Sequence, residues 1–123
     1  MKPGQIYDLF FPFKPPLKPS QGSGKKRPAL IMSVTDDEIM IAVVVKITSS
    51  SSTEIFPNRI EITHWAEAGL EKQSYVEIDS EILIRITNTP PYRGELVESD
   101  FNKVLTEFVK LKTKSIRRSG KTT

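Results

Sequence analysis

Short runs of hydrophobic residues, separated by polar and turn-forming residues, make up most of the sequence. The longest run, residues 38–48 (EIMIAVVVKIT), is apolar almost throughout and rich in β-branched residues, as in a central strand buried on both faces. Shorter runs of strand length or alternating pattern predict further strands at residues 5–11, 27–34, 60–62, 75–79 and 82–86.

A proline-rich basic stretch separates the first two predicted strands. Residues 12–26 (PFKPPLKPSQGSGKK) contain four prolines between positions 12 and 19, which excludes a helix or a central strand. We expect a long, partly extended loop, and loops longer than about 12 residues in a compact domain tend to be functional or linkers. Pro28 fits the following strand only at its beginning, where a ladder hydrogen bond can be missing.

Helical periodicity is clear only near the C-terminus. Its apolar residues recur at i, i+3, i+4, i+7 and i+8, namely Phe101, Val104, Leu105, Phe108, Val109 and Leu111. We expect Ser99 or Asp100 to cap this helix. Five or six short strands with one terminal helix predict a mainly β fold, a small curved barrel or sandwich whose open side the helix covers.

The composition agrees with one globular domain. The chain has 123 residues, of which 37% are apolar and 27% charged. We place the domain at residues 1–112, followed by a flexible basic tail at 113–123. No apolar run approaches the roughly 18 residues of a membrane span, and residues 1–14 lack the pattern of a signal peptide, so we expect a cytoplasmic protein without membrane contact.

The charges are segregated along the chain. Residues 1–35 carry 6 basic and 1 acidic side chains, residues 36–109 carry 6 and 14, and residues 110–123 carry 6 and 0. Two basic ends therefore flank an acidic middle, which is compatible with a basic surface facing a polyanion. A basic tail by itself is more often a solvated end than a binding site.

Most catalytic residue sets are missing. Without cysteine, the chain cannot form disulfides, thiolate zinc sites or a cysteine nucleophile, and with one histidine a zinc hydrolase is nearly excluded; we expect no metal and no cofactor. His64, beside Trp65, suits packing or hydrogen bonding better than catalysis. The stretch GSGKKR at 22–27 lacks the spacing of a nucleotide-binding loop.

Two polar residues remain where apolar strands run into loops, Arg27 and Thr48. A guanidinium can hold a phosphate through two parallel hydrogen bonds, and a threonine hydroxyl can donate to a phosphoryl oxygen. The pair therefore suits phosphodiester chemistry. The alternative is that Arg27 is a surface strand residue and that Thr48 starts a turn.

Four segments in order carry a resemblance to a known family: GQIYDLFFPF (4–13), GSGKKRPALIMS (22–33), KITS (46–49) and WAEAGLEKQSYVEID (65–79). Together with the amphipathic C-terminal helix, they resemble the MazF/PemK toxins of toxin–antitoxin pairs over residues 3–112. The resemblance implies an SH3-like barrel, a homodimer, and metal-independent cleavage of single-stranded RNA to cyclic phosphate and 5′-hydroxyl ends. It also implies a cognate antitoxin.

The same resemblance assigns residues to the reaction. It makes Arg27 the catalytic arginine and Thr48 its phosphate-orienting partner, with Asp79 as the third catalytic candidate. One branch of the family has an arginine two positions before that aspartate, where this chain has Glu77. Asp79 either accepts the proton of the substrate's 2′-hydroxyl or caps the turn into the next strand.

RNA contacts are expected around this pair. We assign Lys25, Lys26 and Ser49 to RNA binding, with the alternative that the lysines lie in a solvated loop. Phe13 is either a base-stacking aromatic or, as we favour, a core residue. Trp65 and Leu70 are expected to pack against the barrel or a dimer interface.

A second hypothesis is a barrel of this fold that does not cut RNA. Glu77 would place negative charge near the phosphate site, which favours a member that only binds RNA. Related toxins that poison gyrase end in tryptophan-glycine-isoleucine, whereas this sequence ends IRRSGKTT, so a gyrase-directed protein is less favoured.

Overall fold

The fold is an antiparallel sheet with one helix, as predicted. The computed structural model describes residues 1–12, 16, 19–20, 22–35 and 37–120, with side chains as far as residue 114. The elements are β1 (Gln5–Pro12), β2 (Gly24–Val34), β3 (Met40–Thr48), β4 (Arg59–Ile62), β5 (Ser74–Ile86), β6 (Tyr92–Glu95) and α1 (Glu98–Gly120). Phe13 lies outside the described residues.

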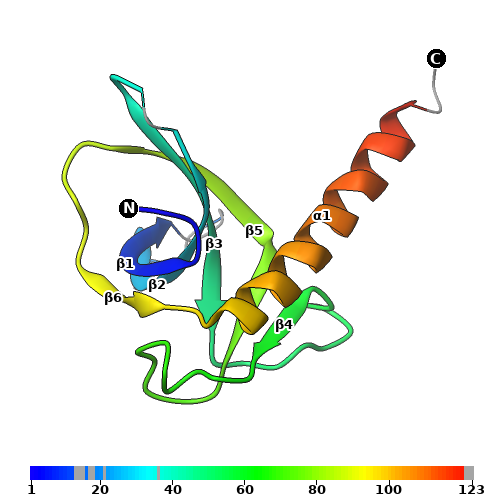
Figure 1. The fold of residues 1–123 in the computed structure, drawn as a ribbon, viewed down its shortest axis with the longest axis horizontal. Helices are drawn as coiled ribbons and strands as arrows, with labels where there is room; N and C mark the ends of the chain where they lie inside the picture. Colours follow the sequence, from blue (N-terminus) through cyan, green and yellow to red (C-terminus); the bar gives the residue numbers. More distant parts are fainter. Residues whose placement is uncertain (13–15, 17–18, 21, 36, 121–123) are drawn as a thin grey trace.

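The six strands form one curled sheet in the order β4-β5-β3-β2-β1-β6, in which every pair of neighbours is antiparallel. Figure 1 shows this half-barrel and the helix α1, which begins beside it and leans away along its length. The prediction of a mainly β barrel-like fold with a C-terminal helix is confirmed.

The two strands predicted at 75–79 and 82–86 are a single strand, β5. Its register with β3 shifts between Val44 and Lys46. At this irregularity the Ser80 hydroxyl accepts the Lys46 N–H at 2.7 Å and donates to the Glu77 carbonyl at 2.6 Å. The hydroxyl of Ser80 thus replaces part of the backbone hydrogen-bond ladder between β3 and β5, as at a β-bulge. The polar residues at the bulge interrupt the apolar pattern, which is why the sequence suggested two strands.

The strand β2 begins three residues earlier than predicted. Lys25 and Lys26 are therefore strand residues opposite Phe11 and Phe10, not loop residues. Pro28 lies inside the strand, opposite Asp8. The Asp8 N–H points away from β2 and donates to the Pro91 carbonyl at 2.9 Å, so pairing with β1 does not require a donor at position 28.

Two apolar clusters lie on opposite faces of the central strands. One face contributes Leu30, Val45 and Ile47 to a cluster that α1 covers through Val104. The other face contributes Ile31 and Val44 to a second cluster. The expectation that the strand at 38–48 is buried on both faces is confirmed for residues 42–47, whereas the strand begins at Met40, and Ile39 and Ile41 are exposed.

The expected helix cap is wrong. The helix begins at Glu98, so both Ser99 and Asp100 lie in its first turn. The buried Asp100 carboxylate instead accepts the N–H groups of Thr63 and His64, at 3.2 and 2.8 Å. It thus anchors the segment that follows β4.

The helix continues past residue 112, where the sequence division places the domain end, to Gly120. The division into a domain and a flexible tail stays a prediction. Among the described residues, no helix is long and apolar enough to cross a membrane.

Candidate functional site

A pocket of about 250 Å³ lies where the start of β2 meets the end of β3. The segment before β5 and the strand β6 complete it. The lining residues are Lys25, Lys26, Arg27, Pro28, Ile47, Thr48, Ser49, Leu70, Glu71, Lys72, Ser74 and Arg93. The structure thus brings together Arg27, Thr48 and the three residues assigned to RNA binding. We call this the cationic pocket.

Antiparallel pairing explains why these residues meet. Ala29 of β2 lies opposite Lys46 of β3. Counted two residues back along β2 and two residues on along β3, this register brings Arg27 level with Thr48. Residues 21 positions apart in sequence therefore share one pocket, each carried on a strand whose backbone is fixed by the sheet.

The pocket is strongly cationic. Five of its lining side chains are basic, Lys25, Lys26, Arg27, Lys72 and Arg93, whereas only Glu71 is acidic. In the part of the chain that the structure describes, no carboxylate pairs with Arg27. Arg27 is half-buried, and its guanidinium is available to an anion such as a phosphate.

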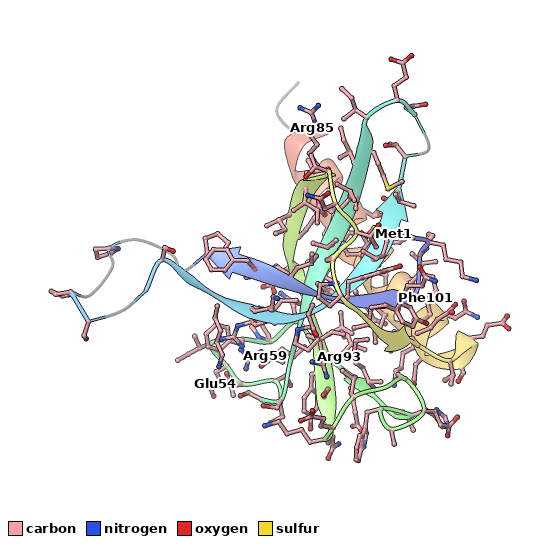
Figure 2. All side chains as sticks on the ribbon, turned by 90° about the vertical axis from the view of Figure 1, so that its left-hand side faces the viewer. Met1, Glu54, Arg59, Arg85, Arg93 and Phe101 are labelled. Atoms are coloured by element: carbon pink, nitrogen blue, oxygen red, sulfur yellow. The ribbon has the colours of Figure 1, made fainter. Side chains whose placement is uncertain are left out.

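Arg93 is held by Asp8 of β1. Its Nε and Nη2 donate to the two oxygens of that carboxylate at 2.8 and 3.1 Å. The hydrogen bond and charge of Asp8, with the charge of Glu71, raise the pKa of Arg93 although burial opposes this. Figure 2 shows Arg93 beneath the β1–β2 hairpin. The Arg93 side chain is therefore fixed at the pocket wall, and Asp8 offsets its charge.

Thr48 is the last residue of β3 and is half-buried. Its Oγ1 accepts the Ser50 N–H at 3.3 Å. Because this contact uses the oxygen as an acceptor, the hydroxyl proton stays available for a donor role toward a substrate oxygen.

Asp79 does not line the cationic pocket. Its exposed carboxylate accepts a hydrogen bond from the Asn58 side chain at 3.3 Å. Asn58 in turn lines a second cavity, of about 450 Å³, between β4, β5 and α1. The catalytic role of Asp79 stays a prediction.

Glu77 is also outside the cationic pocket, and its charge is neutralised. The buried carboxylate lies 2.9 Å from Lys46 Nζ and 3.2 Å from Arg59 Nη2. Burial alone would raise the pKa of Glu77, but the hydrogen bonds and charges of Lys46 and Arg59 outweigh it and lower the pKa. The glutamate therefore joins β3, β4 and β5 and does not face a phosphate in the cationic pocket.

Sequence reasoning missed part of the pocket. Glu71, Lys72 and Ser74 lie within WAEAGLEKQSYVEID, so the quoted segment contained a signal for them. Arg93 had none, because the four-residue strand β6 has no apolar alternation. Leu70 is buried as expected, yet it also borders the pocket. Among the residues with described positions, no group of three His, Asp or Glu side chains could hold a metal ion.

The curled antiparallel sheet with one terminal helix is consistent with the architecture of small barrel toxins. Residues 2–111 match the family of PemK-like, MazF-like toxins of type II toxin–antitoxin systems, and this chain belongs to that family. Membership confirms the resemblance seen in the sequence and implies a cognate antitoxin as partner. A comparison with curated proteins gives no match.

Proposed function

We propose that this toxin is a sequence-selective, metal-independent endoribonuclease that cleaves single-stranded RNA, including mRNA in the cytoplasm, to 2′,3′-cyclic phosphate and 5′-hydroxyl ends. The observation that carries the proposal is the meeting of Arg27 and Thr48 in one cationic pocket. Family membership supports it, since endoribonuclease activity is typical of these toxins.

In the proposed reaction the 2′-hydroxyl of the substrate attacks the adjacent phosphorus. A bond forms between O2′ and phosphorus, the bond between phosphorus and O5′ breaks, the 2′-hydroxyl loses its proton to a base, and the departing O5′ gains one. Negative charge builds up on the non-bridging oxygens, where the Arg27 guanidinium stabilises it and the Thr48 hydroxyl donates a hydrogen bond. We assign Arg27 an electrostatic role, because an arginine is a poor proton donor.

Lys25, Lys26 and Ser49 contact the flanking RNA backbone in this proposal. The two lysines supply affinity without sequence preference. We further propose that the toxin acts as a homodimer and that the antitoxin inhibits it by covering the cationic pocket with a segment that folds on binding.

Cleavage of a long unstructured RNA in EDTA, with mapping of new 5′ ends, tests the proposal. We expect discrete cuts with 5′-hydroxyl ends from the wild type and none from Arg27→Ala. The matched control is Arg85→Ala, which removes an exposed arginine of β5 outside the pocket and should leave the cuts unchanged. Wild-type cleavage by Arg27→Ala, with its fold intact by circular dichroism, would show that the site is wrong.

Asp79→Asn tests the remaining catalytic assignment. If Asp79 accepts the 2′-hydroxyl proton, its loss should lower kcat by about 10²–10⁴-fold. Because its carboxylate lies outside the pocket beside Asn58, we expect a smaller loss than from Arg27→Ala. Single-turnover cleavage rates of the two variants measure the difference.

The hypothesis of a member that only binds RNA rests on negative charge near the phosphate. Glu77 is paired with Lys46 and Arg59 and does not line the pocket, so this motivation is lost. We therefore propose no second function.

A further inference from the structure

Phe56 is a partly exposed aromatic residue in the loop that joins β3 to β4, and this loop begins at Ser49, which lines the cationic pocket. It is 45% exposed, and its neighbour Ile55 is 81% exposed. An apolar side chain gains from burial, so an exposed aromatic that is fixed in place is a candidate ligand contact. Figure 2 shows Glu54 and Arg59 of this region on the side toward which β1 and β2 project.

The loop fixes the backbone of Phe56. The Thr53 N–H donates to the Phe56 carbonyl at 3.0 Å, and the Phe56 N–H donates to Thr53 Oγ1 at 3.1 Å. These two bonds close a compact turn. The ring therefore projects from a defined position in the loop.

Arg59 contacts both the Phe56 ring and the part of the loop that follows Ser49. Its guanidinium carbon lies 4.2 Å from the centroid of the Phe56 ring, so a cation covers one ring face. Its Nη1 also donates to the Ser51 carbonyl at 3.3 Å. Ser51 is two residues beyond Ser49, which lines the cationic pocket. The Phe56 ring and Ser49 of the pocket thus belong to one loop, which the Arg59 side chain holds in place.

The Arg59 side chain is in turn held by the buried carboxylate of Glu77. The side chains of Arg59 and Glu77 are only 10% and 7% exposed, so neither is free to stack on a ligand. Lys46 Nζ binds the second Glu77 oxygen at 2.9 Å. This contact links Arg59 and Glu77 to β3, two residues before Thr48. Among Phe56, Arg59, Glu77 and Lys46, the Phe56 ring is therefore the most exposed side chain.

We propose that Phe56 is a base-stacking platform for a nucleotide that flanks the scissile phosphate. The proposal rests on the ribonuclease function proposed above. Proteins that hold single-stranded nucleic acid combine a cationic groove with aromatic rings on which bases stack. Here the cationic pocket supplies the first part and Phe56 the second. Arg59 and Glu77 are positioning residues that hold the ring and do not touch the base.

Substitution of the ring measures its contribution. We expect Phe56→Ala to raise KM for an RNA that spans the cut by roughly tenfold and to leave kcat unchanged, because stacking strengthens binding but does not act on phosphorus. Phe56→Tyr keeps an aromatic face and should retain the wild-type KM. Phe56→Leu keeps the apolar character but not the face and should resemble Phe56→Ala. The matched control is Ile55→Ala, with an unchanged KM.

The positioning role of Arg59 is tested separately. Arg59→Lys keeps the charge, but an ammonium cannot contact Glu77, Ser51 and the ring at once. We expect it to raise KM as Phe56→Ala does. The double variant Arg59→Lys, Phe56→Ala should be no worse than Phe56→Ala alone, since both remove the same platform. Additive losses would overturn the positioning role.

Abasic substitutions locate the stacked base. At one position beside the cut, removing the base should raise KM for the wild type but have no further effect on Phe56→Ala. Three results would each overturn the stacking role of Phe56. The first is an equal rise in KM for an abasic site at every position, and the second is an unchanged KM in Phe56→Ala. The third is dissociation of a dimer by that variant, seen in sedimentation. If the wild type neither binds nor cuts RNA, the proposed function fails first and the platform with it.

Discussion

Glu77 is the residue whose role in the structure differs most from the role that its position in the sequence suggests. In the sequence it is an acid where part of the family has an arginine, and it suggested repulsion of a phosphate. In the structure it is buried between Lys46 and Arg59, and it holds Arg59, which directly follows the loop that contains Phe56. Its contribution is to stability and to the position of that loop.

Removing this charge should destabilise the fold. Glu77→Gln leaves Lys46 and Arg59 facing a neutral amide, and we expect a loss of about 3 kcal/mol in the free energy of unfolding, near the lower end of the range for broken buried pairs because Lys46 is partly exposed. Urea denaturation at pH 7 measures it. The control is Glu95→Gln, whose exposed pair with Lys2 should be worth less than about 1 kcal/mol.

The same carboxylate predicts a pH dependence. Because the folded-state pKa of Glu77 lies below its ordinary value of 4.5, its stabilisation is fully present above that value and is lost as the pH falls through the folded-state pKa. The difference in unfolding free energy between the wild type and Glu77→Gln should therefore shrink in acid. A difference that stays constant from pH 7 to about pH 3 would contradict this prediction.

At the scale of elements, the pocket wall depends on close contact between β6 and the turn that follows β4. A Cβ atom added at Gly94 would collide with the Ala68 carbonyl oxygen, and one added at Gly69 would collide with the Arg93 carbonyl oxygen. Gly69 also has φ of +89°, which favours glycine. These two glycines let the turn and the strand meet beside Arg93.

We therefore expect Gly94→Ala to lower the free energy of unfolding by about 1–3 kcal/mol, because backbone atoms on both sides must shift. It should also lower cleavage activity, since Arg93 is the adjacent residue. Gly22→Ala is the control: its nearest neighbour, the Gly24 carbonyl oxygen, would lie 3.9 Å from the added carbon, so we expect a change within about 0.5 kcal/mol. Equal thermal denaturation midpoints for both variants would contradict the close packing.

At the scale of the whole molecule, charge is distributed unevenly over the fold. The net charge is only +3, but the cationic pocket gathers five basic residues against one acidic residue. Several carboxylates of the acidic middle are used elsewhere, for example Glu77 with Arg59 and Asp100 with the turn after β4. Asp8, from the first part of the chain, pairs with Arg93 beside the pocket. A nearly neutral protein can therefore present a local site for a polyanion.

This distribution predicts how RNA affinity depends on salt. Replacing Lys25 and Lys26 by alanine should make the plot of log affinity against log salt concentration shallower by about 1.4, or about 0.7 for each lost phosphate contact on a single strand. Binding to a non-cleavable 2′-O-methyl RNA at several salt concentrations measures the slope. Lys110→Ala, an exposed lysine of α1 outside the pocket, is the control and should not change it.

Local pattern predicted much of the fold and part of the site. The apolar run at 38–48 predicted β3, the helical spacing predicted α1, and the strand ends at Arg27 and Thr48 predicted the two residues that meet in the pocket. Period and residue type suffice for such features, because burial of one face or both follows from them directly. The resemblance over residues 3–112 identified the family from segments in order.

Other features depended on contacts between distant parts of the chain. Arg93 meets Asp8 across 85 positions, and Glu77 meets Arg59 across 18. Neither pair leaves a periodic trace in the sequence, and β6 and the bulge in β5 lack the alternation that signals a strand.

The sequence alone therefore determined the class of fold, the family and the residues at the ends of β2 and β3. Only the tertiary structure decided which charges are neutralised, which ones face the pocket, and that Phe56 stays exposed on a braced loop. The physical reason is that strand and helix preferences act over a few neighbouring residues, whereas burial and ion pairing are fixed by whatever the folded chain brings alongside.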